Sequence, residues 1–176
     1  DMPLTELRRR VAVVPQEVEL FSGSVRDNVA LFDDARSDAD VEGALRSVGL
    51  GSLVDSGIHR PLGMGGGGLS AGEAQLLALA RVWLRDPDLV VLDEATARVD
   101  PETESQLEEA IAGLLVGRTA LVIAHRLSTL KRVDEIAVFD HGHLVEHGER
   151  EALAGESDSR YRHLLTVSLE TEEVTA

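Results

Sequence analysis

One segment accounts for much of the expected structure of this chain: residues 69–104, which read LSAGEAQLLALARVWLRDPDLVVLDEATARVDPETE. Ser70 is a favoured helix N-cap, and Glu73 follows three residues later, so the pair predicts a capping box at a helix start. Apolar residues then recur at helical spacing until Pro87, which ends the helix because its ring fixes the backbone and has no N–H to donate. The first half of the segment therefore predicts a helix with a wide apolar face.

A short apolar run follows this helix and ends in two carboxylates. Residues 89–92, Leu-Val-Val-Leu, suit a parallel strand that is covered on both faces. The run delivers Asp93 and Glu94 at its carboxyl end, where ligands bind in open α/β sheets. Two adjacent carboxylates at the end of a buried run are costly without a cation, so they indicate a functional site. Asp100 and Pro101 are a favoured N-cap and first helical residue, and they predict a second helix.

Two further apolar runs extend the pattern of strands and helices. Residues 11–14 precede Pro15 and Gln16, and residues 119–124 precede His125. Because strands alternate with helices along the chain, the sequence predicts an α/β fold with a mostly parallel sheet.

These pieces together resemble an ATP-binding-cassette (ABC) ATPase. The motifs occur in the family's order and cover nearly the whole chain. Residues 18–29, VELFSGSVRDNV, are similar to exporter-type cassettes, whose helical subdomain opens in this way. The matching motifs are the Q-loop (Gln16), the signature (69–73), the Walker B strand (89–94), the D-loop (97–100) and the H-loop (His125).

The family's P-loop, GxxxxGK[ST], holds phosphates with backbone N–H groups and a lysine. Here the single lysine is Lys131, which lies between Leu130 and Arg132, so no P-loop can be written in this sequence. In the family the P-loop lies upstream of the Q-loop. We therefore expect the chain to be the carboxyl-terminal two-thirds of a nucleotide-binding domain of the P-loop NTPase type. The resemblance implies ATPase activity in the full-length protein and none in this fragment alone.

The resemblance implies catalytic roles for Glu94, His125 and Gln16. Glu94 would be the general base that polarises the attacking water. His125 would contact the γ-phosphate of ATP. Asp93 would hold Mg²⁺, through water, and Gln16 would be a second, neutral metal ligand. The implied cofactors are ATP and Mg²⁺.

The signature would bind ATP that is held by an opposing subunit. A helix start suits this role because it offers free N–H groups and a positive dipole end to an anion. The usual LSGGQ reads LSAGE here, so Glu73 would oppose the phosphate unless its capping role turns it away. The usual Ser-Ala-Leu-Asp of the D-loop reads Ala-Arg-Val-Asp. The cofactor-binding residues implied are Ser70, Ala71, Gly72, Glu73 and Asp100.

The resemblance also implies domains and partners. A partial ATPase core would comprise residues 1–23 and 87–169, a helical subdomain with the signature would comprise residues 24–86, and residues 170–176 would be an acidic tail. The partners would be a second nucleotide-binding domain, identical or different, and the transmembrane domains of an exporter. The protein would lie at the cytoplasmic face of the cell membrane.

Two other functions compete with an exporter ATPase. One is a soluble ABC ATPase outside transport, and the other is a non-catalytic dimerisation module. The net charge of −15, from 17 basic and 32 acidic residues, disfavours a nucleic-acid partner. This charge and the exporter-like residues 18–29 argue against the soluble ABC ATPase. The presence of Glu94 and His125 argues against the non-catalytic dimerisation module.

Four side chains near the carboxyl end are candidate metal ligands because they lie close together in the sequence: His141, His143, Glu146 and His147. They fall in a segment that reads as a hairpin turning at His141 and Gly142. Because alternate residues of a strand point to opposite faces, these side chains are divided between two faces. We therefore expect no metal at His141, His143 and His147.

Overall fold

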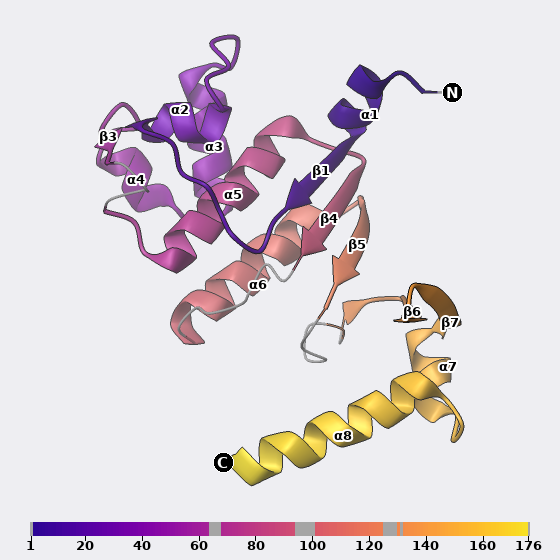
Figure 1. Ribbon diagram of the computed structural model, residues 1–176. Coiled ribbons are helices and arrows are strands. Elements are labelled where there is room, and N and C mark those ends of the chain that lie inside the picture. The colour runs from indigo at the N-terminus through magenta and orange to yellow at the C-terminus, as the bar shows by residue number, and fades with distance from the viewer. Residues whose placement is uncertain (1, 64–67, 94–100, 125–129, 131, 176) are drawn as a thin grey trace. The chain divides into compact units, whose positions relative to one another are not determined.

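The computed structural model describes residues 2–63, 68–93, 101–124, 130 and 132–175, with backbone alone for residues 101–102 and 168–175. The chain divides into two compact units, Asp1–Ile123 and Ala124–Ala176, which are described separately (Figure 1). Among the described residues, no helix combines the length and the apolar character needed to cross a bilayer.

A three-stranded parallel sheet lies in the first unit, as the sequence predicts. The strand order is β1-β4-β5, with Val14 opposite Leu92 and Asp93 opposite Ile123. The inward residues of β1 and β4 are buried and belong to the main hydrophobic core, whereas Val13 is exposed on the opposite face. The strands are β1 (Val11–Val14), β4 (Leu89–Asp93) and β5 (Thr119–Ile123).

Helix α5 (Ala71–Arg85) is the central element of this unit. It contacts β1, α2 (Val25–Ala30), α3 (Asp38–Ser47) and α6 (Pro101–Leu115) (Figure 1). Its apolar face includes Leu76, Leu77 and Leu79, which are 0–1% exposed. The helix ends at Asp86, whose backbone is left-handed (φ 48°), directly before Pro87. The predicted helix and its end are therefore confirmed.

The segment between β1 and α5 contains more regular structure than the sequence indicates. Two-residue strands β2 (Gly23–Ser24) and β3 (Pro61–Leu62) pair antiparallel, and α4 (Gly51–Asp55) follows α3. Such short elements carry no hydrophobic period that a sequence pattern could reveal. The core of this segment is continuous with the core beneath the sheet. Helix α1 (Leu4–Arg10) precedes β1.

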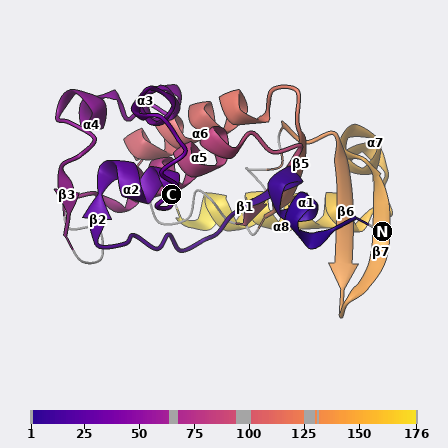
Figure 2. The same cartoon turned by 90° about the horizontal axis from the view of Figure 1, so that it is seen from above.

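In its described part, the second unit contains a β-hairpin and two α-helices. Strands β6 (Glu135–Asp140) and β7 (His143–Glu149) pair antiparallel (Figure 2). His141 and Gly142 both have positive φ (48° and 79°), as a tight I′-type turn requires, so the predicted hairpin is confirmed. Helices α7 (Arg150–Gly155) and α8 (Arg160–Thr175) follow, and the backbone of residues 170–175 in the acidic tail belongs to α8.

Candidate functional site

The parallel register brings the carboxyl ends of β1, β4 and β5 to one edge of the sheet. Asp93 is the last residue of β4 and lies opposite Ile123, the last residue of β5. Val14 ends β1 beside Leu92, and Gln16 lies two residues further on. The structure therefore places Gln16 and Asp93 at the same sheet edge, where ligands bind in open α/β sheets.

Three predicted site residues, Glu94, Asp100 and His125, lie outside the described residues. Their neighbours in the chain are described. Glu94 directly follows β4, Asp100 directly precedes α6, and His125 is two residues beyond β5. The roles of these three residues stay predictions.

The signature segment forms the start of α5 through a capping box. The Ser70 hydroxyl accepts a hydrogen bond from the Glu73 N–H (3.1 Å). The Glu73 carboxylate accepts one from the Ser70 N–H (2.7 Å). The predicted capping box is therefore confirmed, and the charge of Glu73 is directed at the start of its own helix. Ala71 is exposed beside these two residues.

Gly72 lies where α5 packs against α6. A β-carbon at this position would lie 1.9 Å from the Cγ2 of Thr103 on α6. An added β-carbon would therefore require Thr103 or the two helices to shift, so helix packing within the chain favours glycine at this position. Sequence reasoning assigns it only to phosphate binding, because no local pattern links residues 72 and 103.

Gln75 connects α5 to the segment after β1. Its Nε2 donates a hydrogen bond of 2.7 Å to the main-chain carbonyl of Gln16. No sequence motif marks this residue. Its only signal is that it is a polar residue next to the apolar stripe of α5.

Arg81, six residues beyond Gln75 on α5, binds the backbone further along the segment that follows β1. Its Nε donates to the carbonyl of Asn28 (2.8 Å) and its Nη2 to the carbonyl of Glu19 (3.0 Å). The guanidinium also lies 5.8 Å from the centre of the Phe21 ring. Burial lowers the pKa of Arg81. Helix α5 therefore holds both ends of residues 19–28.

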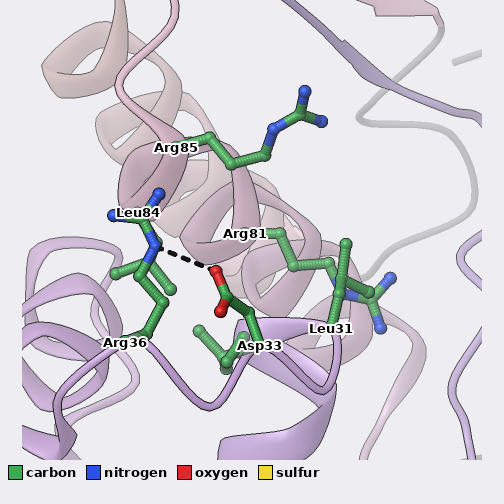
Figure 3. A pocket seen from close by; sticks show the side chains of 8 residues that line it. Leu31, Asp33, Arg36, Arg81, Leu84 and Arg85 are labelled. Carbon is green, nitrogen blue, oxygen red and sulfur yellow. Dashed lines mark ion pairs between the residues drawn. The ribbon is translucent and has the colours of Figure 1, made fainter. Parts of the chain in front are cut away.

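A pocket of about 270 Å³ lies between the end of α2 and the last turns of α5 (Figure 3). Arg36 forms an ion pair with Asp33 there (3.6 Å), and the guanidinium of Arg81 points away from that pair. Arg85 donates to the carbonyl of Arg8. Because these cations are engaged within the chain and no predicted site residue lines the pocket, we assign it no ligand. Its lining consists of Val29, Ala30, Leu31, Asp33, Arg36, Arg81, Leu84 and Arg85.

Comparison with protein-family models decides the family. Residues 2–97, more than half of the chain, match the model described as "ABC transporter". This chain belongs to the ABC transporter family.

Individual ABC transporter proteins are similar over most of the chain. It is 42% identical to the probable multidrug resistance ABC transporter ATP-binding/permease protein YheH of Bacillus subtilis, over 87% of this chain and 23% of that protein. It is 43% identical to the ATP-dependent lipid A-core flippase of Cupriavidus pinatubonensis, over 87% of this chain and 27% of the flippase. The chain thus spans about a quarter of the length of these relatives.

A solved ABC transporter structure has the same fold. The structure of a bacterial Atm1-family ABC exporter with ATP bound matches with a TM-score of 0.80 and 33% identity, over 92% of this chain and 29% of that one. Family membership and this match confirm the resemblance and the fold class inferred from the motifs. Membership of the ABC transporter family also implies ATP binding.

In the histidine-rich hairpin of this ABC transporter chain, His141, His147 and Glu146 have partners within the chain. His141 contacts Asp140 (2.7 Å) and His147 contacts Glu135 (3.0 Å). Glu146 accepts hydrogen bonds at the start of α8. Within the described part of the chain, no three acidic, histidine or cysteine side chains converge as metal ligands would. The absence of a metal at this hairpin stays a prediction.

Glu146 should give the second unit of this ABC transporter chain a pH-dependent stability. The Glu146 carboxylate accepts hydrogen bonds from the N–H of Tyr161 (2.8 Å), the N–H of Arg160 and the Ser159 hydroxyl. These bonds, with the Tyr161 bond the largest cause, lower the pKa of Glu146 below its ordinary 4.5. This stabilisation is present above pH 4.5 and is lost as the pH falls through the lowered pKa. Glu146→Gln should therefore reduce the free energy of unfolding above that pH, and the difference should shrink below it.

Denaturant unfolding of the chain over a pH series measures this effect. The matched control is Glu151→Gln, because Glu151 pairs with Arg150 at the surface (3.0 Å). Exposed pairs contribute about 0–1 kcal/mol, so the control should show a smaller pH dependence. Equal pH profiles for wild type and Glu146→Gln would contradict the role of Glu146.

Proposed function

We propose that this chain is part of the nucleotide-binding domain of an ABC exporter, in which ATP hydrolysis drives transport across a membrane. The observation that carries the proposal is the parallel register at the sheet edge. Asp93 ends β4 at this edge, Gln16 follows β1 by two residues, and Glu94 and His125 follow β4 and β5 in the chain, which supports the proposal. The relatives' names, an exporter, a flippase and an ATP-binding/permease protein, support transport.

Within one subunit, the sheet edge would hold the catalytic groups. Asp93 and Gln16 offer a carboxylate and an amide oxygen, the hard donors that suit Mg²⁺. The ion, when bound, would neutralise charge on the phosphates of ATP. Glu94 would accept a proton from the attacking water, and His125 would contact the γ-phosphate.

Across the subunit interface, the start of α5 would contact ATP held by the opposing subunit. Ser70 and Ala71 are exposed at this helix start, as such a contact requires. The Glu73 carboxylate is bonded to the Ser70 N–H, so an incoming phosphate meets a charge that is already partnered. Asp100, directly before α6, would contact the same partner. Because this sequence contains no P-loop, hydrolysis would require other parts of the full-length protein.

The proposed partners are a second nucleotide-binding domain and transmembrane domains, with the chain at the cytoplasmic face of the membrane. Names such as "ATP-binding/permease protein" join the two functions in one relative. A soluble ABC ATPase is the alternative. It would fractionate away from membranes, whereas the proposed exporter would remain with them.

Glu94→Gln in the full-length protein tests the proposed chemistry. The amide keeps the shape of the carboxylate and loses its basicity, so ATP should still bind. Hydrolysis should fall by about a hundredfold or more, the low end of what a general base contributes. Steady-state ATPase rates and retention of labelled ATP measure the two effects.

The matched control is Glu109→Gln, which makes the same change at an exposed position on α6. It should leave both measurements unchanged. Hydrolysis within a few-fold of wild type in Glu94→Gln would show that Glu94 is not the base. No hydrolysis in the wild-type transporter would favour a dimerisation module instead.

A further inference from the structure

We propose that Gln75 is a positioning residue for the reaction: it holds the backbone of Gln16 against helix α5, and so sets where the Gln16 side chain can act. The proposal rests on the proposed metal-binding role of Gln16. It concerns a contact within one chain, between the helix that begins with the signature and the loop that follows β1.

The contact is direct and partly buried. Gln75 lies in the second turn of α5 and is only 6% exposed. Its Nε2 donates to the carbonyl oxygen of Gln16 at 2.7 Å, across 59 residues of sequence. Gln16 itself is exposed and lies beyond the last ladder pair of β1, so the strand does not fix its backbone. The Gln75 bond supplies that constraint.

The orientation of the Gln75 amide follows from this bond. Turning the amide over would set its oxygen against the Gln16 carbonyl, and two acceptors repel. In the observed orientation, Oε1 is buried without a hydrogen-bond partner in the described part of the chain. A buried acceptor without a donor is costly, and an apolar residue would avoid the cost. Gln75 therefore fits a role in placing Gln16 better than a role in stabilising the core.

The consequence is a mechanical link between two parts of the site. Gln75 is three residues beyond Gly72 on the same helix, so the signature and Gln16 share one rigid support. A displacement of the start of α5 would shift the backbone of Gln16 with it. We therefore expect loss of the Gln75 amide to act on the reaction in the same way as loss of the Gln16 side chain.

The test is ATPase activity of the full-length transporter as a function of Mg²⁺ concentration. Gln75→Met keeps a similar volume and removes the donor. It should raise the Mg²⁺ concentration for half-maximal activity and lower kcat. The ratio of kcat to that concentration should fall by roughly tenfold, as it does when a residue that orients a metal ligand is lost. Gln75→His, which keeps a side-chain N–H, should recover part of the activity. Gln106→Met, the same change at an exposed position on α6, should behave as wild type.

A double-mutant cycle with Gln16→Ala decides between positioning and general destabilisation. If Gln75 acts through the Gln16 side chain, the double variant should be no worse than Gln16→Ala alone. If the defects of the two single variants multiply in the double variant, or if folded Gln75→Met keeps the wild-type Mg²⁺ dependence, then Gln75 does not position Gln16. Either result would leave the proposed role of Gln16 untouched. If Gln75→Met does not fold, Gln75→Asn provides the same comparison because its shorter amide cannot reach the carbonyl. A wild-type Mg²⁺ dependence in Gln16→Ala would instead remove the proposed role of Gln16, and this proposal with it.

Discussion

Gly72→Ala should abolish the ATPase activity of the full-length transporter, and Thr103→Ala in the same chain should restore part of it. The added β-carbon would lie 1.9 Å from the Cγ2 of Thr103, 3.0 Å from its Cβ and 3.3 Å from its Oγ1. Since carbon atoms pack at about 3.5–4.0 Å, α5 and α6 would have to separate or Thr103 would have to change rotamer. Overpacking of this kind costs about 1–3 kcal/mol or more, and here it moves the signature itself.

The second-site changes separate packing from ligand contact. Thr103→Ala removes Cγ2 and Oγ1 and leaves one contact of 3.0 Å, which small shifts can relieve. Thr103→Ser removes only Cγ2, so it should rescue Gly72→Ala less well. Gly113→Ala is the matched control, because its β-carbon would meet the Trp83 ring at 3.7 Å, an ordinary contact. That change should be neutral or stabilising by up to about 1 kcal/mol, the difference in helix propensity.

Denaturant unfolding and ATPase rates should both be measured for Gly72→Ala with and without the changes at Thr103. Recovery of both quantities in Gly72→Ala with Thr103→Ala would show that the glycine is needed for packing within the chain. A double variant that regains stability and stays inactive would contradict this, and would assign the requirement to contact with ATP across the subunit interface.

The parts of the site that the sequence predicts are those set by local rules. The capping box at Ser70 depends on two residues three positions apart, and both of its hydrogen bonds are found. The places of Gln16 and Asp93 follow from apolar runs and from the rule that parallel strands share a carboxyl edge. The hairpin follows from His141 and Gly142, which suit the positive φ of its turn.

The contacts that the sequence does not predict join residues far apart. The bond from Gln75 to Gln16 spans 59 residues, and the bond from Arg81 to Glu19 spans 62. In both, a side chain binds a main-chain carbonyl, which every residue has, so the partner's identity gives no signal. The close approach at Gly72 depends on how α5 crosses α6, which helical periodicity leaves open.

Arg81→Met should be the most destabilising substitution among the described arginines of the first unit. The guanidinium donates to the carbonyls of Asn28 and Glu19 and lies over the Phe21 ring. Methionine can fill part of the space, but it leaves two acceptors without their donor. Asn28 is buried, whereas the Glu19 carbonyl is exposed and can bond to water instead. An unsatisfied buried group costs about 1–3 kcal/mol, so we expect a loss of about 1–3 kcal/mol in the free energy of unfolding. Arg46→Met, which breaks an exposed pair with Asp55 (3.0 Å), should cost at most about 1 kcal/mol.

Arg81→Lys shows whether charge or geometry matters at this position. Lysine keeps the positive charge, but its single ammonium cannot reproduce the planar fork that spans two carbonyls. It should therefore recover only a small part of the stability lost in Arg81→Met. Amide hydrogen exchange should locate the damage in residues 19–28, because Arg81 holds both ends of that segment. The Asn28 side chain also accepts a hydrogen bond from the Phe21 N–H near its start (2.8 Å). If Arg81→Met costs no more than Arg46→Met, or if exchange rises evenly across the unit, then α5 does not hold this segment through Arg81.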